Sequence, residues 1–145
     1  GNAYVGLGQH QRAIEDQDEA IRLNPKSAGA YSNRGYAYYH LGRYRLAIQD
    51  LDNAISLGPQ LAAVYGNRGF AYTNLGKHRR AIEDFDEAIR LNPESSIAYA
   101  GRAAVHATLG RDAQAQQDVE SAVELGFDAV RLRVFMEQIK IGVTE

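Results

Sequence analysis

The chain has 145 residues, no cysteine, 45% hydrophobic residues and a formal net charge of -2. The lack of cysteine excludes a disulfide framework, and no apolar run is long enough to span a membrane. The small net charge gives no reason to expect a nucleic acid or membrane partner. Because no signal peptide is visible either, we expect a cytoplasmic location.

A spacing of 34 residues organises the sequence. The pair Leu-Gly recurs with this spacing four times, beginning at Leu7, Leu41, Leu75 and Leu109. The three prolines, Pro25, Pro59 and Pro93, keep the same spacing. A fixed period of this size predicts stacked supersecondary units rather than one globular core.

The first unit, residues 1–27, is predicted to be a partial repeat. Gly1 corresponds to Gly35 of the next unit, so we expect that the start of a helix is missing and that the chain is a fragment. Within this unit we predict a short helix over 1–7, a turn at Gly8 and a second helix over His10–Leu23.

The second and third units, 28–61 and 62–95, are the most regular part of the chain. Apolar residues at helical spacing predict two helices in each unit. Glycine permits the left-handed backbone that ends many helices, so we place a turn at Gly42, and Pro59 ends the second helix. The predicted helices are Ala28–Leu41, Tyr44–Leu57, Ala62–Leu75 and His78–Leu91.

The fourth unit, 96–129, has diverged, and residues 130–145 follow it as a capping helix and tail. Asp128 is a good N-cap residue for this last helix. Leu132, Phe135, Met136 and Ile139 share one face, which we predict to close the end of the stack, whereas Arg131 falls elsewhere.

The second unit carries a set of residues at fixed offsets: Tyr31, Gly35, Tyr38, Ala47, Ala54 and Pro59. In this pattern the repeat resembles the tetratricopeptide repeat (TPR) family. The departure is an arginine, Arg34 in this unit, where the family usually has leucine. The resemblance implies an all-α, right-handed solenoid of helix-turn-helix hairpins whose first helices line a concave groove.

The same resemblance implies which residues face the groove. Asparagine can donate and accept hydrogen bonds to a peptide backbone, and aromatic side chains are typical interface anchors. In the alternative interpretation the asparagines are merely solvated and the aromatic residues pack on adjacent helices. The groove of the fourth unit is small and apolar at Ala100, Gly101, Ala104 and Ala107, and it could admit a close-packed helix or an apolar side chain. The candidate peptide-binding residues are Asn2, Asn33, Tyr36, Tyr39, His40, Asn67, Phe70 and Asn74.

Some members of the family bind the C-terminal carboxylate of chaperones with a clamp of Lys, Asn and Arg. Asn2 and Asn33 match two clamp positions, but Ala63 and Asn67 stand where the cations would be. A carboxylate without charge-assisted donors is held weakly, so we do not expect a chaperone tail as partner. With no basic residue predicted in the groove, nucleic acid is not expected either.

In each of the three complete units, an arginine of the first helix has a complementary aspartate in the second helix of the same unit. In an antiparallel hairpin the two lie at similar heights, so we predict structural ion pairs within a unit or between neighbours; the alternative is that both residues are solvated. The paired residues are Arg34 with Asp50, Arg68 with Asp84, and Arg102 with Asp118. The aspartate pairs Asp50/Asp52 and Asp84/Asp86 are otherwise predicted to form a solvated strip.

No motif indicates catalysis, a metal site or a cofactor. The four histidines are not at ligand spacing, and the glycines follow the repeat. We therefore expect a non-enzymatic scaffold whose groove binds a peptide or helix of a partner protein. The alternative is a self-assembly module, in which the uncapped N-terminal end stacks on another copy to form a homo-oligomer.

Overall fold

The computed structural model describes residues 2–58 and 61–143, with side chains over 6–58 and 61–138. This part of the chain forms eight α-helices and no strand. The helices are α1 (Asn2–Leu23), α2 (Ala28–His40), α3 (Tyr44–Leu57), α4 (Ala62–Asn74), α5 (His78–Leu91), α6 (Ser96–Thr108), α7 (Asp112–Glu124) and α8 (Ala129–Val143).

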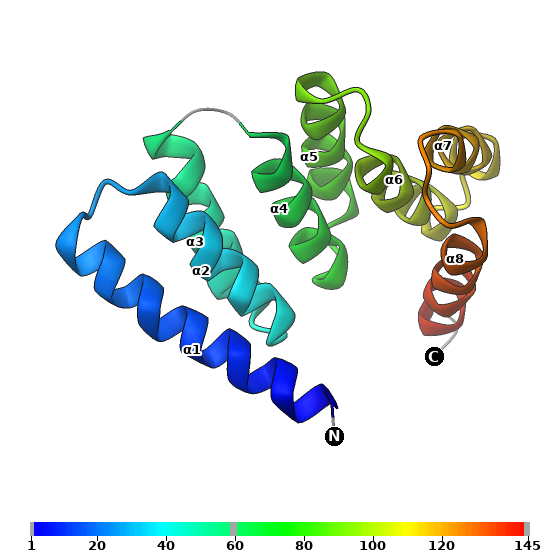
Figure 1. Ribbon diagram of the computed structural model, residues 1–145. Helices are drawn as coiled ribbons and strands as arrows, with labels where there is room; N and C mark the ends of the chain where they lie inside the picture. Colours follow the sequence, from blue (N-terminus) through cyan, green and yellow to red (C-terminus); the bar gives the residue numbers. More distant parts are fainter. Residues whose placement is uncertain (1, 59–60, 144–145) are drawn as a thin grey trace.

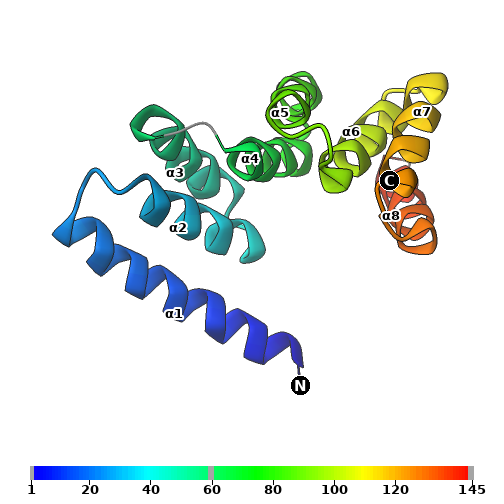
Figure 2. The same cartoon turned by 45° about the horizontal axis from the view of Figure 1, so that its top comes forward.

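The helices form a curved stack of hairpins. The pairs α2/α3, α4/α5 and α6/α7 follow one another along an arc, with α1 at one end and α8 at the other (Figure 1). A second view shows the same order (Figure 2). Helices α1 to α7 mainly pack on their neighbours in the sequence, whereas α8 packs mainly on α6. The helices α2, α4, α6 and α8 also contact one another in succession. The predicted all-α solenoid is confirmed.

Glycine sets the turn within each complete hairpin. Gly42, Gly76 and Gly110 have φ angles of 71°, 70° and 71°, in the left-handed region that favours glycine. At the first of these turns, Gly42 N donates to Tyr39 O and Arg43 N donates to Tyr38 O, both at 2.9 Å. These bonds satisfy carbonyl groups at the end of α2. The predicted turn at Gly42 is confirmed, with α2 ending one residue earlier than expected.

The predicted turn at Gly8 is wrong. α1 runs without a break from Asn2 to Leu23, and Gly8 lies in its interior. Gly8 corresponds to Gly42, but a helix over residues 1–7 is only about two turns long. So short a segment makes few packing contacts that would offset the loss of helical hydrogen bonds at a turn.

Small residues bring neighbouring helices close together, both within a hairpin and between successive hairpins. A Cβ atom on Gly35 would lie 2.9 Å from Leu51 Cγ, and one on Gly101 would lie 2.5 Å from Phe85 Cζ. The side chains of Leu51 and Phe85 are completely buried. These glycines are therefore required by the packing of a neighbouring second helix, which is α3 of the same hairpin for Gly35 and α5 of the preceding hairpin for Gly101.

α8 packs along α6 and covers the inner face of the fourth unit. Leu132 is 1% exposed and packs with Ala100 of α6 and Ala122 of α7. Asp128 Oδ1 accepts a hydrogen bond of 2.9 Å from Arg131 N, so the predicted N-cap is confirmed. The small apolar face at Ala100 thus admits a close-packed helix, as predicted, but the helix is the chain's own α8 and not one of a partner.

Candidate functional site

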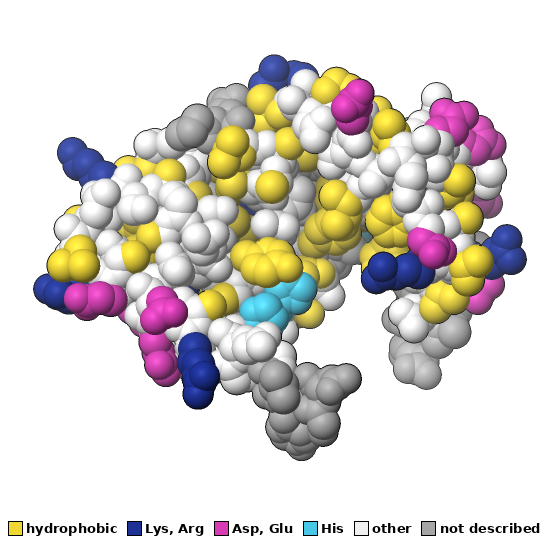
Figure 3. Space-filling model, viewed as in Figure 1, with side chains coloured by type: hydrophobic (Ala, Val, Ile, Leu, Met, Phe, Trp, Pro, Cys, Tyr) yellow, Lys and Arg dark blue, Asp and Glu magenta, His cyan; other side chains and the backbone are white. Residues whose placement is uncertain are grey.

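A hollow of about 330 Å³ lies on the inner side of the arc. Helices α2, α4, α6 and α8 and the loop before α8 contribute to it. Hydrophobic side chains gather around this hollow, with histidine beside them (Figure 3). The lining residues are Tyr36, Tyr39, His40, Asn67, Phe70, Ile97, Ala100, Phe127, Arg131 and Phe135. We call this surface the inner groove.

Aromatic rings form one wall of the inner groove. Tyr36 is 46% exposed and its ring lies 4.3 Å from that of His40. Phe70 packs edge-on against the buried Phe85 at 5.0 Å and lies 6.4 Å from Tyr39. The wall therefore has one end anchored in the core and one end available to a ligand.

Burial also shifts two acid–base equilibria in this wall. It raises the pKa of Tyr39, so that its phenol stays protonated and can donate a hydrogen bond. It lowers the pKa of His40, and His10, stacked on the same ring at 4.8 Å, lowers it further. At neutral pH the wall therefore presents an uncharged imidazole from His40.

The structure brings five of the eight candidate residues together in the inner groove: Tyr36, Tyr39, His40, Asn67 and Phe70. Asn33 is exposed and does not line the hollow. Asn74 also lies outside it, and its Nδ2 donates to Phe70 O at 2.9 Å. The side chain of Asn2 lies outside the described residues.

Sequence reasoning missed the wall that the C-terminal segment contributes. Phe127, Arg131 and Phe135 line the groove, although Arg131 had been predicted on another face. The expectation of a groove without basic residues is wrong for the same reason. The four-residue spacing of Arg131 and Phe135 places them on one side of α8, which could have indicated that they act together.

The arginines of the first helices lie between two helices and bind two carboxylates each. Arg68 donates from Nε and Nη2 to both oxygens of Asp84, at 2.8 and 2.7 Å. Its Nη1 donates to Asp52 of the preceding unit at 2.7 Å. The hydrogen bonds that the Asp84 carboxylate accepts from Arg68 raise the pKa of Arg68, which keeps the guanidinium charged.

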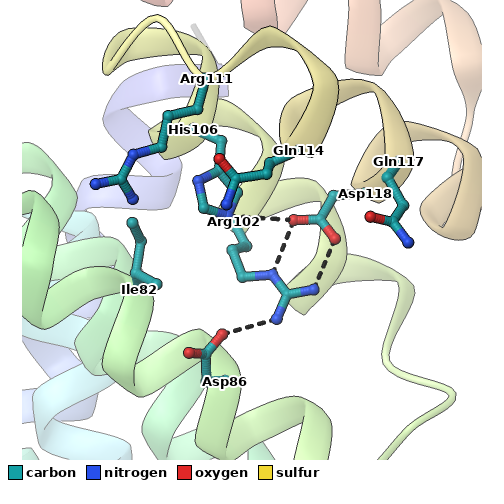
Figure 4. A pocket seen from close by; sticks show the side chains of 8 residues that line it. All are labelled: Ile82, Asp86, Arg102, His106, Arg111, Gln114, Gln117 and Asp118. Atoms are coloured by element: carbon teal, nitrogen blue, oxygen red, sulfur yellow. Dashed lines mark hydrogen bonds and ion pairs between the residues drawn. The ribbon is translucent and has the colours of Figure 1, made fainter.

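The other two arginines repeat this arrangement. Arg34 binds Asp50 and Asp18, and Arg102 binds Asp118 and Asp86. Figure 4 shows Arg102 between its two partners. Asp50 and Asp84 are 3% and 4% exposed, so the prediction of a solvated aspartate strip is wrong for them. The additional partners keep the repeat spacing, so their recurrence was visible in the sequence.

A second hollow, of about 340 Å³, opens beside the last of these arginines. His106 lines it in the position that Tyr38 and Tyr72 hold in the preceding units, together with Arg111 and Gln114 (Figure 4). Burial lowers the pKa of His106, whose Nδ1 is buried without a hydrogen-bond partner in the described structure. At this hollow the repeat has a histidine in place of a tyrosine.

Among the residues whose side chains are described, no group of three His, Cys, Asp or Glu is arranged to hold a metal ion. Over the same part of the chain, no helix has the length and apolar character needed to cross a membrane.

Two models of the tetratricopeptide repeat match the chain, one over residues 1–65 and the other over 62–95. Together they span 1–95 of its 145 residues, and the stacked hairpins are those of this repeat. The chain belongs to the tetratricopeptide repeat family. No curated protein matches it significantly.

Solved structures of TPR proteins are similar to this one. A crystal structure of MamA matches with a TM-score of 0.80 and 21% identity, covering 93% of this chain and 79% of that one. The first TPR of Spaghetti (RPAP3), bound to the HSP90 peptide SRMEEVD, matches at 0.71 and 25% identity, covering 81% and 94%. The second TPR domain of human RPAP3, with the HSP70 peptide SGPTIEEVD, matches at 0.67 and 28% identity, covering 76% and 92%.

Proposed function

We propose that this TPR domain is a non-enzymatic scaffold whose inner groove binds a peptide or helix of a partner protein. The observation that carries this proposal is the convergence of aromatic residues from α2, α4 and the C-terminal segment on one open hollow. Such hollows bind ligands because they bury apolar surface and fix orientation with a few polar groups.

The exposed part of the groove has the composition of a binding surface. Tyr36 and Ile97 are 46% and 56% exposed, so both offer apolar area that a partner can bury. Asn67 lies between them on α4 and supplies an amide that can donate and accept hydrogen bonds. Rigid aromatic side chains lose little rotamer entropy on binding, which favours Tyr36 as an anchor.

The partner proposed here differs from the chaperone tails bound by the RPAP3 domains. Ala63 and Asn67 replace the cations of the family's carboxylate clamp. Arg131 is positioned on the far wall, on α8, instead. We therefore expect the peptide SRMEEVD to bind weakly, because its terminal carboxylate lacks the two charge-assisted donors.

The test begins with peptides selected from a random display library on the wild-type domain. We expect the double variant Tyr36→Ala/Ile97→Ala to weaken their binding by about tenfold or more, a loss typical of anchor residues. The matched control is Leu23→Ala/Leu61→Ala, which removes two leucines, 69% and 56% exposed, that do not line the groove. Phe70 is unsuitable for this test because it also packs on Phe85.

Binding that survives in the groove variant, or that is lost equally in the control, would contradict the proposal. Circular dichroism of both variants shows whether the helices are retained, so that loss of binding is separated from unfolding.

Self-assembly is the second candidate, and exposed apolar residues on the terminal helices favour it. Leu7 and Leu23 on α1 and Val130 and Val134 on α8 are between 46% and 69% exposed. Contact between such ends is heterologous and generates open assemblies. Light scattering at increasing concentration distinguishes the two: a constant monomer mass excludes self-assembly as the principal function.

A further inference from the structure

Positive charge is concentrated on one edge of the solenoid. Four equivalent segments of the repeat, 8–12, 42–46, 76–80 and 110–114, contain seven of the chain's 16 Lys and Arg residues but one of its 18 Asp and Glu residues. The cations are Arg12, Arg43, Arg45, Lys77, Arg79, Arg80 and Arg111. We call this surface the loop edge.

The repeat brings these segments into a row. Three of them contain the turns of the successive hairpins α2/α3, α4/α5 and α6/α7 (Figure 1). The fourth lies in α1, where His10 stacks on His40 at 4.8 Å and so places it beside the first turn. The chain as a whole is slightly acidic, so its net charge hides this cationic row.

The cations of the loop edge make few contacts that hold the fold together, and the one cation–π contact among them over the described residues places Arg80 5.7 Å from the ring of Tyr72. Over the described residues, only Arg79 among them forms an ion pair, a 3.6 Å contact with Glu83 in which Arg79 is 94% exposed. By contrast, Arg68 is largely buried between two aspartates. The charges of the loop edge therefore remain available to another molecule.

Their position opposes helix stability. Arg43, Lys77 and Arg111 are the N-cap residues of α3, α5 and α7, and none of them makes a side-chain capping bond. The N-terminus of a helix carries a partial positive charge, so cations there are unfavourable, and Ser or Asp would be better caps. Ser27 does cap α2, by accepting a hydrogen bond from Ala30 N at 3.2 Å.

Apolar side chains lie between the cations. A hollow of about 550 Å³ is lined by Leu109 together with Arg79 and Arg111, and one of about 370 Å³ by Leu46 together with Arg43. Leu46 and Leu109 are 42% and 41% exposed. A surface that alternates cations with leucines complements a polypeptide that alternates carboxylates with apolar side chains, whereas a phosphate polymer would leave the leucines uncovered.

We propose that the loop edge binds an acidic segment of a partner protein that carries interspersed apolar residues. This surface shares no residue with the lining of the inner groove, so the proposal does not depend on groove binding.

The test uses a labelled peptide of glutamates with interspersed leucines, and the same peptide with glutamine in place of glutamate. The edge variant is Arg43→Asp/Lys77→Asp/Arg111→Asp, which reverses three equivalent charges. Its control, Arg22→Asp/Lys26→Asp/Arg133→Asp, makes the same change in charge at three exposed cations outside the loop edge.

We expect the acidic peptide to bind the wild type and the control, with an affinity that falls as salt is raised. The edge variant should lose roughly tenfold or more of this affinity, as happens when attractive interface charges become repulsive. Its melting temperature should stay equal or rise, because aspartate is a favourable N-cap. With an unchanged or higher melting temperature, loss of binding cannot be caused by unfolding. If the melting temperature of the triple variant is below that of the wild type, the single variant Lys77→Asp is measured in its place.

Equal affinity for the edge variant and the control, or for the acidic and glutamine peptides, would overturn the proposal. Preferential binding of a single-stranded DNA oligonucleotide, or of vesicles containing phosphatidylserine, would assign the loop edge to a different class of partner and overturn it as well. The groove variant Tyr36→Ala/Ile97→Ala should bind the acidic peptide normally, which keeps the two proposals separately testable.

Discussion

At the scale of single residues, Arg68 shows how a charged side chain replaces an apolar one in a packed repeat. Its guanidinium uses three donors on two carboxylates from successive units, so its charge is compensated where it is buried. The rings of Tyr65 and Tyr72 lie 5.6 and 5.8 Å from the guanidinium carbon and add cation–π contact. The arginine thus joins two neighbouring units.

We predict that Arg68→Ala lowers the free energy of unfolding by about 3–5 kcal/mol, because it leaves the buried carboxylate of Asp84 uncompensated. The matched control Arg22→Ala breaks an exposed pair with Glu19 and should have little effect on stability, because solvent screens such pairs. Urea unfolding of both variants measures the difference. Similar small losses would show that the buried pair contributes no more than a surface one.

His106 makes stability depend on pH. Burial lowers its pKa in the folded state, against a weaker opposing effect of Asp118, while Arg102 and Arg111 act in the same direction as burial. An unfolded histidine titrates near pH 6.5, so the unfolded state takes up the proton first as the pH falls. The contribution of the neutral His106 to the free energy of unfolding is therefore fully present above about pH 6.5. It declines below that pH and levels off below the pKa of His106 in the folded state.

The variant His106→Tyr restores the residue of the two preceding units and removes this titration. We expect the variant to gain stability relative to the wild type on going from about pH 8 to about pH 5. His40 titrates in both proteins, so the difference between their unfolding free energies isolates His106. A difference that stays constant with pH would refute the assignment.

At the scale of the elements, the 34-residue period predicted the helices of the second and third units to within one residue. It succeeded because the turns depend on local chemistry, the left-handed glycine at Gly42 and Gly76. The period failed to predict the structure at Gly8, because a glycine at this position of the repeat forms a turn only when both helices of the hairpin can pack. Whether Gly8 forms a turn or continues α1 therefore depends on tertiary contacts that the local sequence does not encode.

We predict that substituting alanine for Gly8 and for Gly42 changes the stability of the protein in opposite directions. Gly8 lies inside a helix with nothing within 4 Å of an added Cβ, so Gly8→Ala should stabilise the protein by roughly 0.5–1 kcal/mol. Gly42 has φ 71°, so Gly42→Ala should destabilise it by about 1–2 kcal/mol. Thermal or urea unfolding measures both. Destabilisation by Gly8→Ala would indicate that the predicted turn forms after all.

The inner groove was predictable only where it is built from the repeat. Tyr36, Asn67 and Phe70 occupy groove positions that the family pattern specifies. The family pattern does not specify that Arg131 and Phe135 line the groove, because the rotation of α8 about its axis depends on how Leu132 packs against Ala100 and Ala122. Periodicity identified the apolar face of this helix but not which of its flanks turns toward the groove.

At the scale of the whole molecule, each unit contacts its neighbours and the stability of the stack should be shared among adjacent units. The curvature turns α2 and α4 toward the end of the arc at which α8 packs on α6 (Figure 2). Paired arginines and small residues hold the units together, and the groove and the loop edge are left on different surfaces. The two proposed sites would allow one partner to be bound at two places at once, which would increase its overall affinity.

The most direct measurement is backbone amide NMR of the labelled domain titrated with a peptide selected by display. Binding in the inner groove predicts chemical-shift changes around Tyr36, Asn67, Ile97 and Arg131, with saturation at one equivalent of peptide and little change along α3 and α5. Changes confined to α3, α5 and α7, with the groove amides unmoved, would contradict the central claim.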